Sequence, residues 1–153
     1  MGIPLYGQET DGNVLKALSS GLKMMKISIA VTDSAPVQNA QIGTLPGGCL
    51  PVFSVVHNSG SVALAGNACV IDVPDITGTF HITGELNALA AGGVVSYMVD
   101  TDAGVAESNT TDEEIRIDGS SGLVTSSGST TVDVYIFYVD GPSIAADSLS
   151  SAL

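Results

Sequence analysis

The sequence predicts an all-β protein, an antiparallel β-sandwich of jelly-roll-like form with an extended N-terminal arm. Short runs rich in Val, Ile, Thr, Tyr and Phe recur along the chain, and within them apolar and polar residues alternate as in half-buried strands. Turn-forming Gly, Pro, Asn and Ser separate the runs. About eight or nine short strands with little helix are typical of antiparallel sandwiches and jelly rolls.

The 153 residues fit one folded domain with arms. Residues 1–23 scatter apolar side chains among Gly and Pro without a sustained period, so we expect an arm held on its own body or on a neighbour. Residues 24–142 form the predicted β-sandwich domain. Residues 143–153 form a C-terminal tail, either a weak helix or a second arm.

The first half of the sandwich opens with the clearest alternation. In residues 24–33, Ile27 and Ile29 alternate with Lys26 and Ser28, which predicts a half-buried antiparallel strand. Further strands are predicted at residues 51–58, 62–64, 67–73 and 79–83, with a brief one near 41–44 inside the loop 34–48.

The second half contains the one candidate helix. Residues 85–91 suit a short helix stopped by Gly92 and Gly93, and a structured loop is the alternative. A strand follows at 94–100, and then a polar, acidic loop. Short strands at 114–117 and 123–125 bracket residues 118–122, which suit a hairpin connection.

The longest predicted strand, residues 130–140, has two unlike faces. One face carries only apolar and aromatic side chains; the other changes from polar to aromatic along its length. We expect its polar start to face solvent and its aromatic end to meet a second layer, from the same chain or from another subunit. The first face holds Val132, Val134, Ile136 and Tyr138, and the second holds Thr131, Asp133, Tyr135, Phe137 and Val139.

The charge balance argues against nucleic acid as a partner. The formal charge is −12, and four Lys and Arg residues are too few to neutralise a phosphate backbone. The Lys and Arg residues are also distributed unevenly along the chain. Lys16, Lys23 and Lys26 all lie in the first 26 residues, and Arg116 is the one Lys or Arg after them. A cationic arm could lie on a neighbouring acidic body, although chance composition is the simpler interpretation.

No segment suggests a membrane or secretory route. Residues 1–22 lack a basic start followed by a continuous apolar stretch, and no apolar run reaches bilayer length. Cys49 and Cys69 are therefore expected to be buried thiols, with a disulfide between them as the alternative.

No pattern in the sequence predicts catalysis, a cofactor or a metal. His57 and His81 are the only imidazoles, and no nucleophile elbow of the Gly-x-Ser-x-Gly type occurs, although spacing alone does not exclude a triad. Two acidic groups could offer oxygen ligands to calcium, but neither has the twelve-residue loop that makes such a site specific. These groups are Asp100 with Asp102, and Asp112 with Glu113 and Glu114.

Both ends of the chain resemble the capsid decoration, or cement, proteins of tailed bacteriophages. The opening Gly2-Ile3-Pro4-Leu5-Tyr6-Gly7 with Asp11-Gly12 is similar to the starts of such proteins, and the run from Val132 to Tyr138 is similar to their closing core strand. The likeness covers the middle of the chain by pattern only.

The resemblance implies a virion protein, made in the host cytoplasm, that binds the outer surface of the head and stabilises the lattice of major capsid proteins. It implies a homo-oligomer, commonly a trimer, and no catalytic residues carry over. A receptor- or glycan-binding sandwich of a viral fibre or adhesin is the alternative, and a small jelly-roll hydrolase is a third class. The expected partner-binding residues are Ile3, Pro4, Leu5 and Tyr6 of the arm, and Tyr135 and Phe137 of the long strand.

Overall fold

The computed structural model describes residues 21–65, 69–74, 79–86, 88–101, 111–119 and 122–140, and these form strands and loops without a helix. Residues 1–20 of the predicted arm and the whole predicted tail lie outside the described residues, whereas residues 21–23 are described and Lys23 already begins the first strand. Within this part of the chain, no helix is long and apolar enough to span a bilayer. The strands are β1 (Lys23–Thr32), β2 (Ala40–Leu45), β3 (Cys49–Asn58), β4 (Leu64–Ala65), β5 (Val70–Pro74), β6 (Thr79–His81), β7 (Val94–Met98), β8 (Asp100–Thr101), β9 (Glu113–Asp118), β10 (Val124–Thr125) and β11 (Ser129–Asp140).

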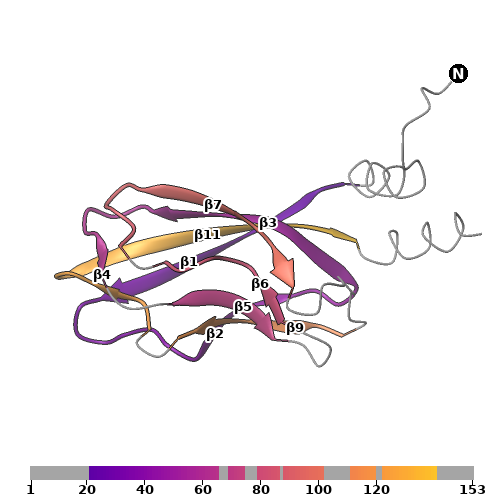
Figure 1. Ribbon diagram of the computed structural model, residues 1–153, viewed down its shortest axis with the longest axis horizontal. Helices are drawn as coiled ribbons and strands as arrows, with labels where there is room; N and C mark the ends of the chain where they lie inside the picture. The colour runs from indigo at the N-terminus through magenta and orange to yellow at the C-terminus, as the bar shows by residue number, and fades with distance from the viewer. Residues whose placement is uncertain are drawn as a thin grey trace, which may run out of the picture.

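Two antiparallel sheets form the two layers of the sandwich (Figure 1). One sheet has the order β1-β11-β3-β7, the other has the order β2-β9-β5-β6-β8, and a small third sheet pairs β10 with β4. The fold class predicted from the sequence, an all-β antiparallel sandwich, is confirmed.

The strand pairing is that of a jelly roll. β1 pairs with β11, β2 with β9, β3 with β7 and β5 with β6, so the chain forms one long nested antiparallel hairpin. The further pairings of β11 with β3 and of β9 with β5 show that this hairpin is wrapped around the core. This wrapping closes the sandwich in the manner of a jelly roll.

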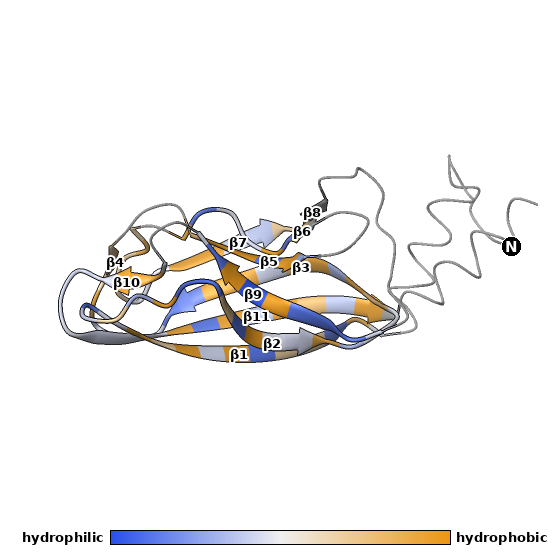
Figure 2. Cartoon of the chain, turned by 90° about the horizontal axis from the view of Figure 1, so that it is seen from below, coloured by the Kyte–Doolittle hydropathy of each residue, from blue (hydrophilic) through white to orange (hydrophobic). Residues whose placement is uncertain are grey.

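The core lies between the two main sheets and is built from every second residue of each strand. Val132, Val134 and Ile136 of β11 are fully buried, as are Ile115 and Ile117 of β9. Figure 2 shows the resulting alternation of hydrophilic and hydrophobic residues along β1, β9 and β11. Each such side chain contributes roughly 1.5–3 kcal/mol through burial, so the alternation fixes which face of each strand points inward.

The predicted strand at residues 94–100 is two strands in different sheets. β7 pairs with β3, whereas β8 pairs with β6 across the sandwich. Between them, the N–H of Val99 donates a hydrogen bond of 3.0 Å to the carbonyl of Val52. Val52 lies in a β-bulge, at the point where the register of β3 against β11 shifts. This bulge therefore binds the residue at which the chain leaves the four-stranded sheet for the five-stranded sheet.

The expected helix at residues 85–91 is wrong, and the alternative, a structured loop, describes what is seen. Ala88 has a φ of +65°, which a helix does not allow. The loop's carbonyl groups are bound by a buried amide instead: Nδ2 of Asn58 donates to the carbonyls of Leu89 (3.3 Å) and Ala90 (3.1 Å). The N–H of Leu64 also donates to Leu89. Tertiary hydrogen bonds therefore override a weak helix preference.

The predicted hairpin across residues 118–122 is also wrong. β9 pairs with β2 and β5, whereas β10 pairs with β4 in the small sheet. Leu123, which precedes β10, forms a bridge with Val37. The chain between β9 and β10 therefore crosses from one sheet to another. Turn-forming residues occur in both kinds of connection, so the local sequence does not tell such a crossing from a hairpin.

Candidate functional site

The first candidate is the outer face of the four-stranded sheet, on which four apolar residues line up across all strands. The pairing register places Met24 opposite Phe137, Phe137 opposite Phe53, and Phe53 opposite Met98. Ile136, the neighbour of Phe137 in β11, is fully buried in the core, so these four side chains point away from it. We call these four residues the apolar row.

The apolar row is accessible to a partner. Met98 is 74% exposed and Met24 is 53% exposed, and Val94 on the same face is 62% exposed. The rings of Phe53 and Phe137 stack at the centre of the row, with centroids 4.3 Å apart and planes 12° from parallel. A contiguous apolar surface with rigid aromatic rings is typical of a protein-binding surface.

A polar network borders the apolar row. The Asp133 carboxylate accepts a hydrogen bond of 2.5 Å from the Ser28 hydroxyl and forms an ion pair of 3.3 Å with Lys26. The Lys26 ammonium also lies 5.6 Å from the centre of the Tyr135 ring. The Ser28 bond, followed by Lys26, lowers the pKa of Asp133 against the opposing effect of burial. The same contact with Asp133 raises the pKa of Lys26.

The structure shows which layer covers each face of the long strand. Val132, Val134 and Ile136 meet the second sheet, and Val139 is buried as well. Tyr135 and Phe137 lie on the outer face, so the same chain does not supply their second layer, and cover from another subunit stays a prediction. Asp133 was expected to face solvent, yet it is 6% exposed.

The predicted partner-binding residues are only partly brought together. Tyr135 and Phe137 share the outer face of the four-stranded sheet, whereas Ile3, Pro4, Leu5 and Tyr6 lie outside the described residues. Sequence reasoning missed Phe53, Met24 and Met98. Strand alternation indicates that Phe53 faces away from Val56, but only the pairing register places it against Phe137.

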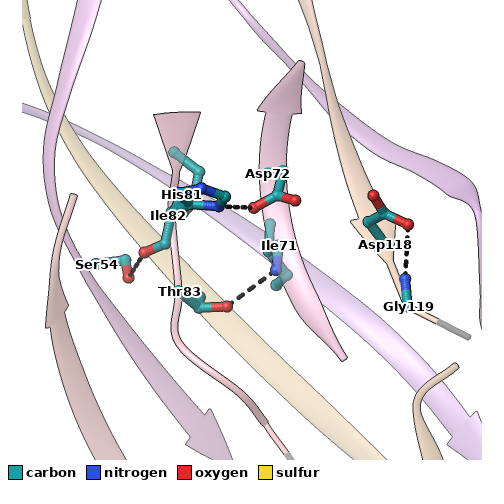
Figure 3. Close-up of polar contacts among 8 residues, drawn as sticks. All are labelled: Ser54, Ile71, Asp72, His81, Ile82, Thr83, Asp118 and Gly119. Carbon is teal, nitrogen blue, oxygen red and sulfur yellow. Dashed lines mark hydrogen bonds and ion pairs between the residues drawn. The ribbon is translucent and has the colours of Figure 1, made fainter. Parts of the chain in front are cut away.

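The second candidate is a hollow on the outer face of the five-stranded sheet. The Asp72 carboxylate lies on β5 and its Oδ1 is 3.0 Å from Nδ1 of His81 on β6 (Figure 3). Asp118 on β9 stands beside them, with its Oδ1 accepting a hydrogen bond of 2.7 Å from the N–H of Gly119. The hollow has a volume of about 500 Å³, and its lining residues are Asn39, Asp72, Pro74, His81, Arg116, Ile117 and Asp118.

Of the remaining candidate residues, Asp112 and Glu114 have structural contacts, whereas Asp102 lies outside the described residues. Asp112 Oδ1 accepts a hydrogen bond of 2.9 Å from the N–H of Gly47, and Glu114 forms an ion pair of 3.0 Å with Arg116. Among the described residues, no group of three or more His, Cys, Asp or Glu is placed to hold a metal ion. His57 lies on the outer face of β3, opposite Asp133 in the register.

Both cysteines are buried thiols, and no disulfide joins them in the described chain, which confirms the expectation. Burial, followed by the negative charges of Asp118 and Asp72, raises the pKa of Cys69 to about 11. This thiol therefore stays protonated near neutral pH, where thiolate chemistry would require the opposite shift.

No family model matches the chain, and no curated protein matches its sequence. Among solved structures, the capsid of Ralstonia phage GP4 contains a similar chain at 20% identity and a TM-score of 0.47, over 79% of this chain and 85% of the other. A chain of the cyanophage Pam1 capsid asymmetric unit is similar at 19% identity and a TM-score of 0.44, over 78% and 84%. A third likeness, to the VP2 subviral particle of infectious bursal disease virus, has 10% identity and a TM-score of 0.39, over 81% of this chain and 34% of the other. Similarity at this level does not assign a role to the chain.

Proposed function

We propose that the protein is a viral structural protein that decorates the outside of a tailed-phage head, where it binds the major capsid protein and stabilises the lattice. It acts as a homo-oligomer, a trimer, and it is not an enzyme. The observation that carries this proposal is the apolar row on the outer face of the four-stranded sheet, because it offers a protein-binding surface on a jelly-roll body.

The apolar row is unlike a normal solvent-facing surface. Single exposed apolar residues are common, but here all four strands of one sheet contribute a side chain to one line, and two of the four are more than half exposed. Covering such a surface with a partner removes apolar area from water, which is the main favourable contribution to protein association.

Electrostatics favours contact on the same face. The chain as a whole carries a formal charge of −12, so two copies, or a copy and another acidic surface, repel each other in general. Beside the apolar row, however, Lys26 balances Asp133 within 3.3 Å. This face therefore combines apolar area with little net charge, and a partner can approach it without strong repulsion.

The N-terminal arm supplies a second contact in this proposal. Residues 1–20 precede Leu22, which is 40% exposed, and β1 begins at Lys23, directly before Met24 of the apolar row. An arm anchored through Ile3, Pro4, Leu5 and Tyr6 would thus continue the same contact region along the chain. Several weak contacts of this kind, multiplied in an oligomer, add through effective concentration, and binding to the assembled lattice alone stabilises that lattice.

Co-sedimentation with purified heads tests the proposal. The probe is heads of the phage that encodes the chain, prepared without this protein, and the bound fraction is measured against added protein. We expect saturable binding to heads, and a loss of at least about tenfold in affinity for the Met98→Ser variant. The Gln41→Ala variant, changed at an exposed position of the other sheet, serves as the matched control. Absence of saturable binding, or equal affinity of both variants, would contradict the proposal.

A further inference from the structure

The hollow on the five-stranded sheet has no part in the proposed decoration role, since it lies on the opposite layer from the apolar row. We infer that it is a binding site for a neutral sugar. The inference goes beyond the proposed function and does not depend on it, because its residues and its test involve neither the capsid nor the apolar row.

A row of three polar side chains forms the floor of the hollow. The register places Arg116 of β9 opposite Asp72 of β5, and Asp72 opposite His81 of β6. Ile71 and Val73 on either side of Asp72 are fully buried in the core, so Asp72 points to the outer face. Its side chain is nevertheless only 8% exposed. A carboxylate is thus held nearly buried at the bottom of a surface hollow, where desolvation disfavours it unless hydrogen-bonding groups surround it.

Polar groups that line the hollow also contact groups around it. Nη1 of Arg116 lies 3.0 Å from Oε2 of Glu114, and its Nη2 donates a hydrogen bond of 3.0 Å to the carbonyl of Asn39. Oδ1 of Asp118 accepts from the N–H of Gly119 at 2.7 Å. These contacts restrict the side chains in part before a ligand arrives, so binding loses less side-chain entropy.

The mixture of donors and acceptors selects the class of ligand. Arg116 donates, the carboxylates of Asp72 and Asp118 accept, and His81 and Asn39 can do both. A hydroxyl group also donates and accepts, so a polyhydroxylated ligand can satisfy such a lining. The volume of about 500 Å³ lies within the range of small-molecule sites, and the charged groups in the lining disfavour a purely apolar ligand.

Charge excludes the two nearest competitors. Asp72 and Asp118 place two carboxylates in the lining, and the guanidinium of Arg116 already faces Glu114, so an acidic sugar would be repelled. A basic side chain of a protein partner would face the guanidinium of Arg116 and has no acceptor for its remaining N–H groups, which a hydroxyl oxygen supplies. A neutral sugar avoids both conflicts.

Nuclear magnetic resonance on the full chain of 15.4 kDa tests the inference directly. The probes are the methyl glycosides of glucose, galactose, mannose and N-acetylglucosamine, each titrated into the ¹⁵N-labelled protein, with sialic acid and a lysine-rich peptide as comparisons. We expect at least one neutral glycoside to bind with a dissociation constant on the order of 1 mM. Its amide shifts should gather on β5, β6 and β9.

The variant Asp72→Asn keeps the side-chain shape and removes the charge, and it should weaken binding at least about tenfold. If its spectrum shows that it does not fold, Arg116→Gln at a more exposed position replaces it, with the same expected loss. Met98→Ser on the opposite sheet should leave sugar affinity unchanged.

The inference is overturned if no neutral glycoside binds, if sialic acid or the lysine-rich peptide binds instead, or if the shifts lie away from the hollow. Unchanged affinity in a folded pocket variant would overturn it as well. Each of these outcomes leaves the binding of the protein to heads untouched, so the two proposals fail separately.

Discussion

Replacing Phe137 by Ala should leave the sandwich folded while weakening its contacts with other proteins. In the structure Phe137 stacks on Phe53 at 4.3 Å and lies on the outer face, outside the core. Loss of such a stacked pair costs about 0.5–1.5 kcal/mol in addition to the loss of buried area. Because Phe137 is only partly buried, we expect the free energy of unfolding to fall by about 1–2 kcal/mol.

The adjacent residue provides the matched control for this substitution. Ile136 is fully buried and points to the other face of the same strand. Truncating a buried Ile to Ala costs about 2–5 kcal/mol because it removes buried area and leaves a cavity. Urea denaturation followed by circular dichroism measures both variants, since the chain has no Trp to report by fluorescence. A loss for Phe137→Ala as large as that for Ile136→Ala would refute the assignment of the apolar row to a solvent-facing surface.

The same substitution should have a larger effect on binding than on folding. An aromatic side chain at the centre of a protein interface commonly contributes about 2 kcal/mol or more, which is roughly a 30-fold change in the dissociation constant. Binding to heads, measured on protein shown to be folded, should therefore fall by that factor for Phe137→Ala. A stable variant that binds heads as well as the original chain would contradict this interpretation.

Three further changes follow from the contacts described above. Asn58→Ala should lower the free energy of unfolding by about 3 kcal/mol in urea denaturation, because the Thr130 hydroxyl and the Val62 carbonyl lose a buried partner. A loss below about 1 kcal/mol would show that the loop at residues 85–91 does not depend on the Asn58 amide. Asp133→Asn should reduce acid sensitivity. Because the pKa of Asp133 is lowered in the folded state, its carboxylate stabilises the fold at pH values above the ordinary Asp pKa of about 4, and this stabilisation is lost as the pH falls through the folded-state pKa. The variant lacks the carboxylate, so its free energy of unfolding should fall less than that of the original chain between about pH 5 and pH 2. An identical acid profile would contradict the role of the Ser28 and Lys26 contacts. Deleting residues 1–20 removes no described strand and should leave the thermal unfolding transition in place while reducing occupancy on heads; unchanged occupancy would show that Ile3, Pro4, Leu5 and Tyr6 are not anchors.

Strand positions were predictable because alternation is a local property of the sequence. The strand at residues 24–33 and the long strand at 130–140 were each placed within one residue of β1 and β11. In each case the contrast between neighbouring side chains is large enough to fix the inward face.

Features that depend on distant residues were not predictable in this way. The loop at residues 85–91 is set by the amide of Asn58, which lies about thirty residues earlier in the chain. The change of sheet at Val99 depends on a bulge in β3. Local preference favours a helix in the first case and one continuous strand in the second, and tertiary contacts decide otherwise.

The candidate sites show the same limit. Alternation places Tyr135 and Phe137 on one face, but which face is covered by the second sheet depends on how the long hairpin wraps. The hollow brings together Asp72, His81 and Arg116 from three strands, and only the register aligns them. Nothing in the spacing of these residues along the chain indicates that they share a site.

A cryo-electron microscopy reconstruction of heads incubated with the purified chain tests the central claim most directly. The proposal predicts added density on the outside of the shell, into which the jelly roll fits with the outer face of β1-β11-β3-β7 toward a subunit contact, either with the capsid or with another copy. Phe53 and Phe137 should lie inside that contact. Heads without added density, or density in which the apolar row faces solvent, would contradict the account.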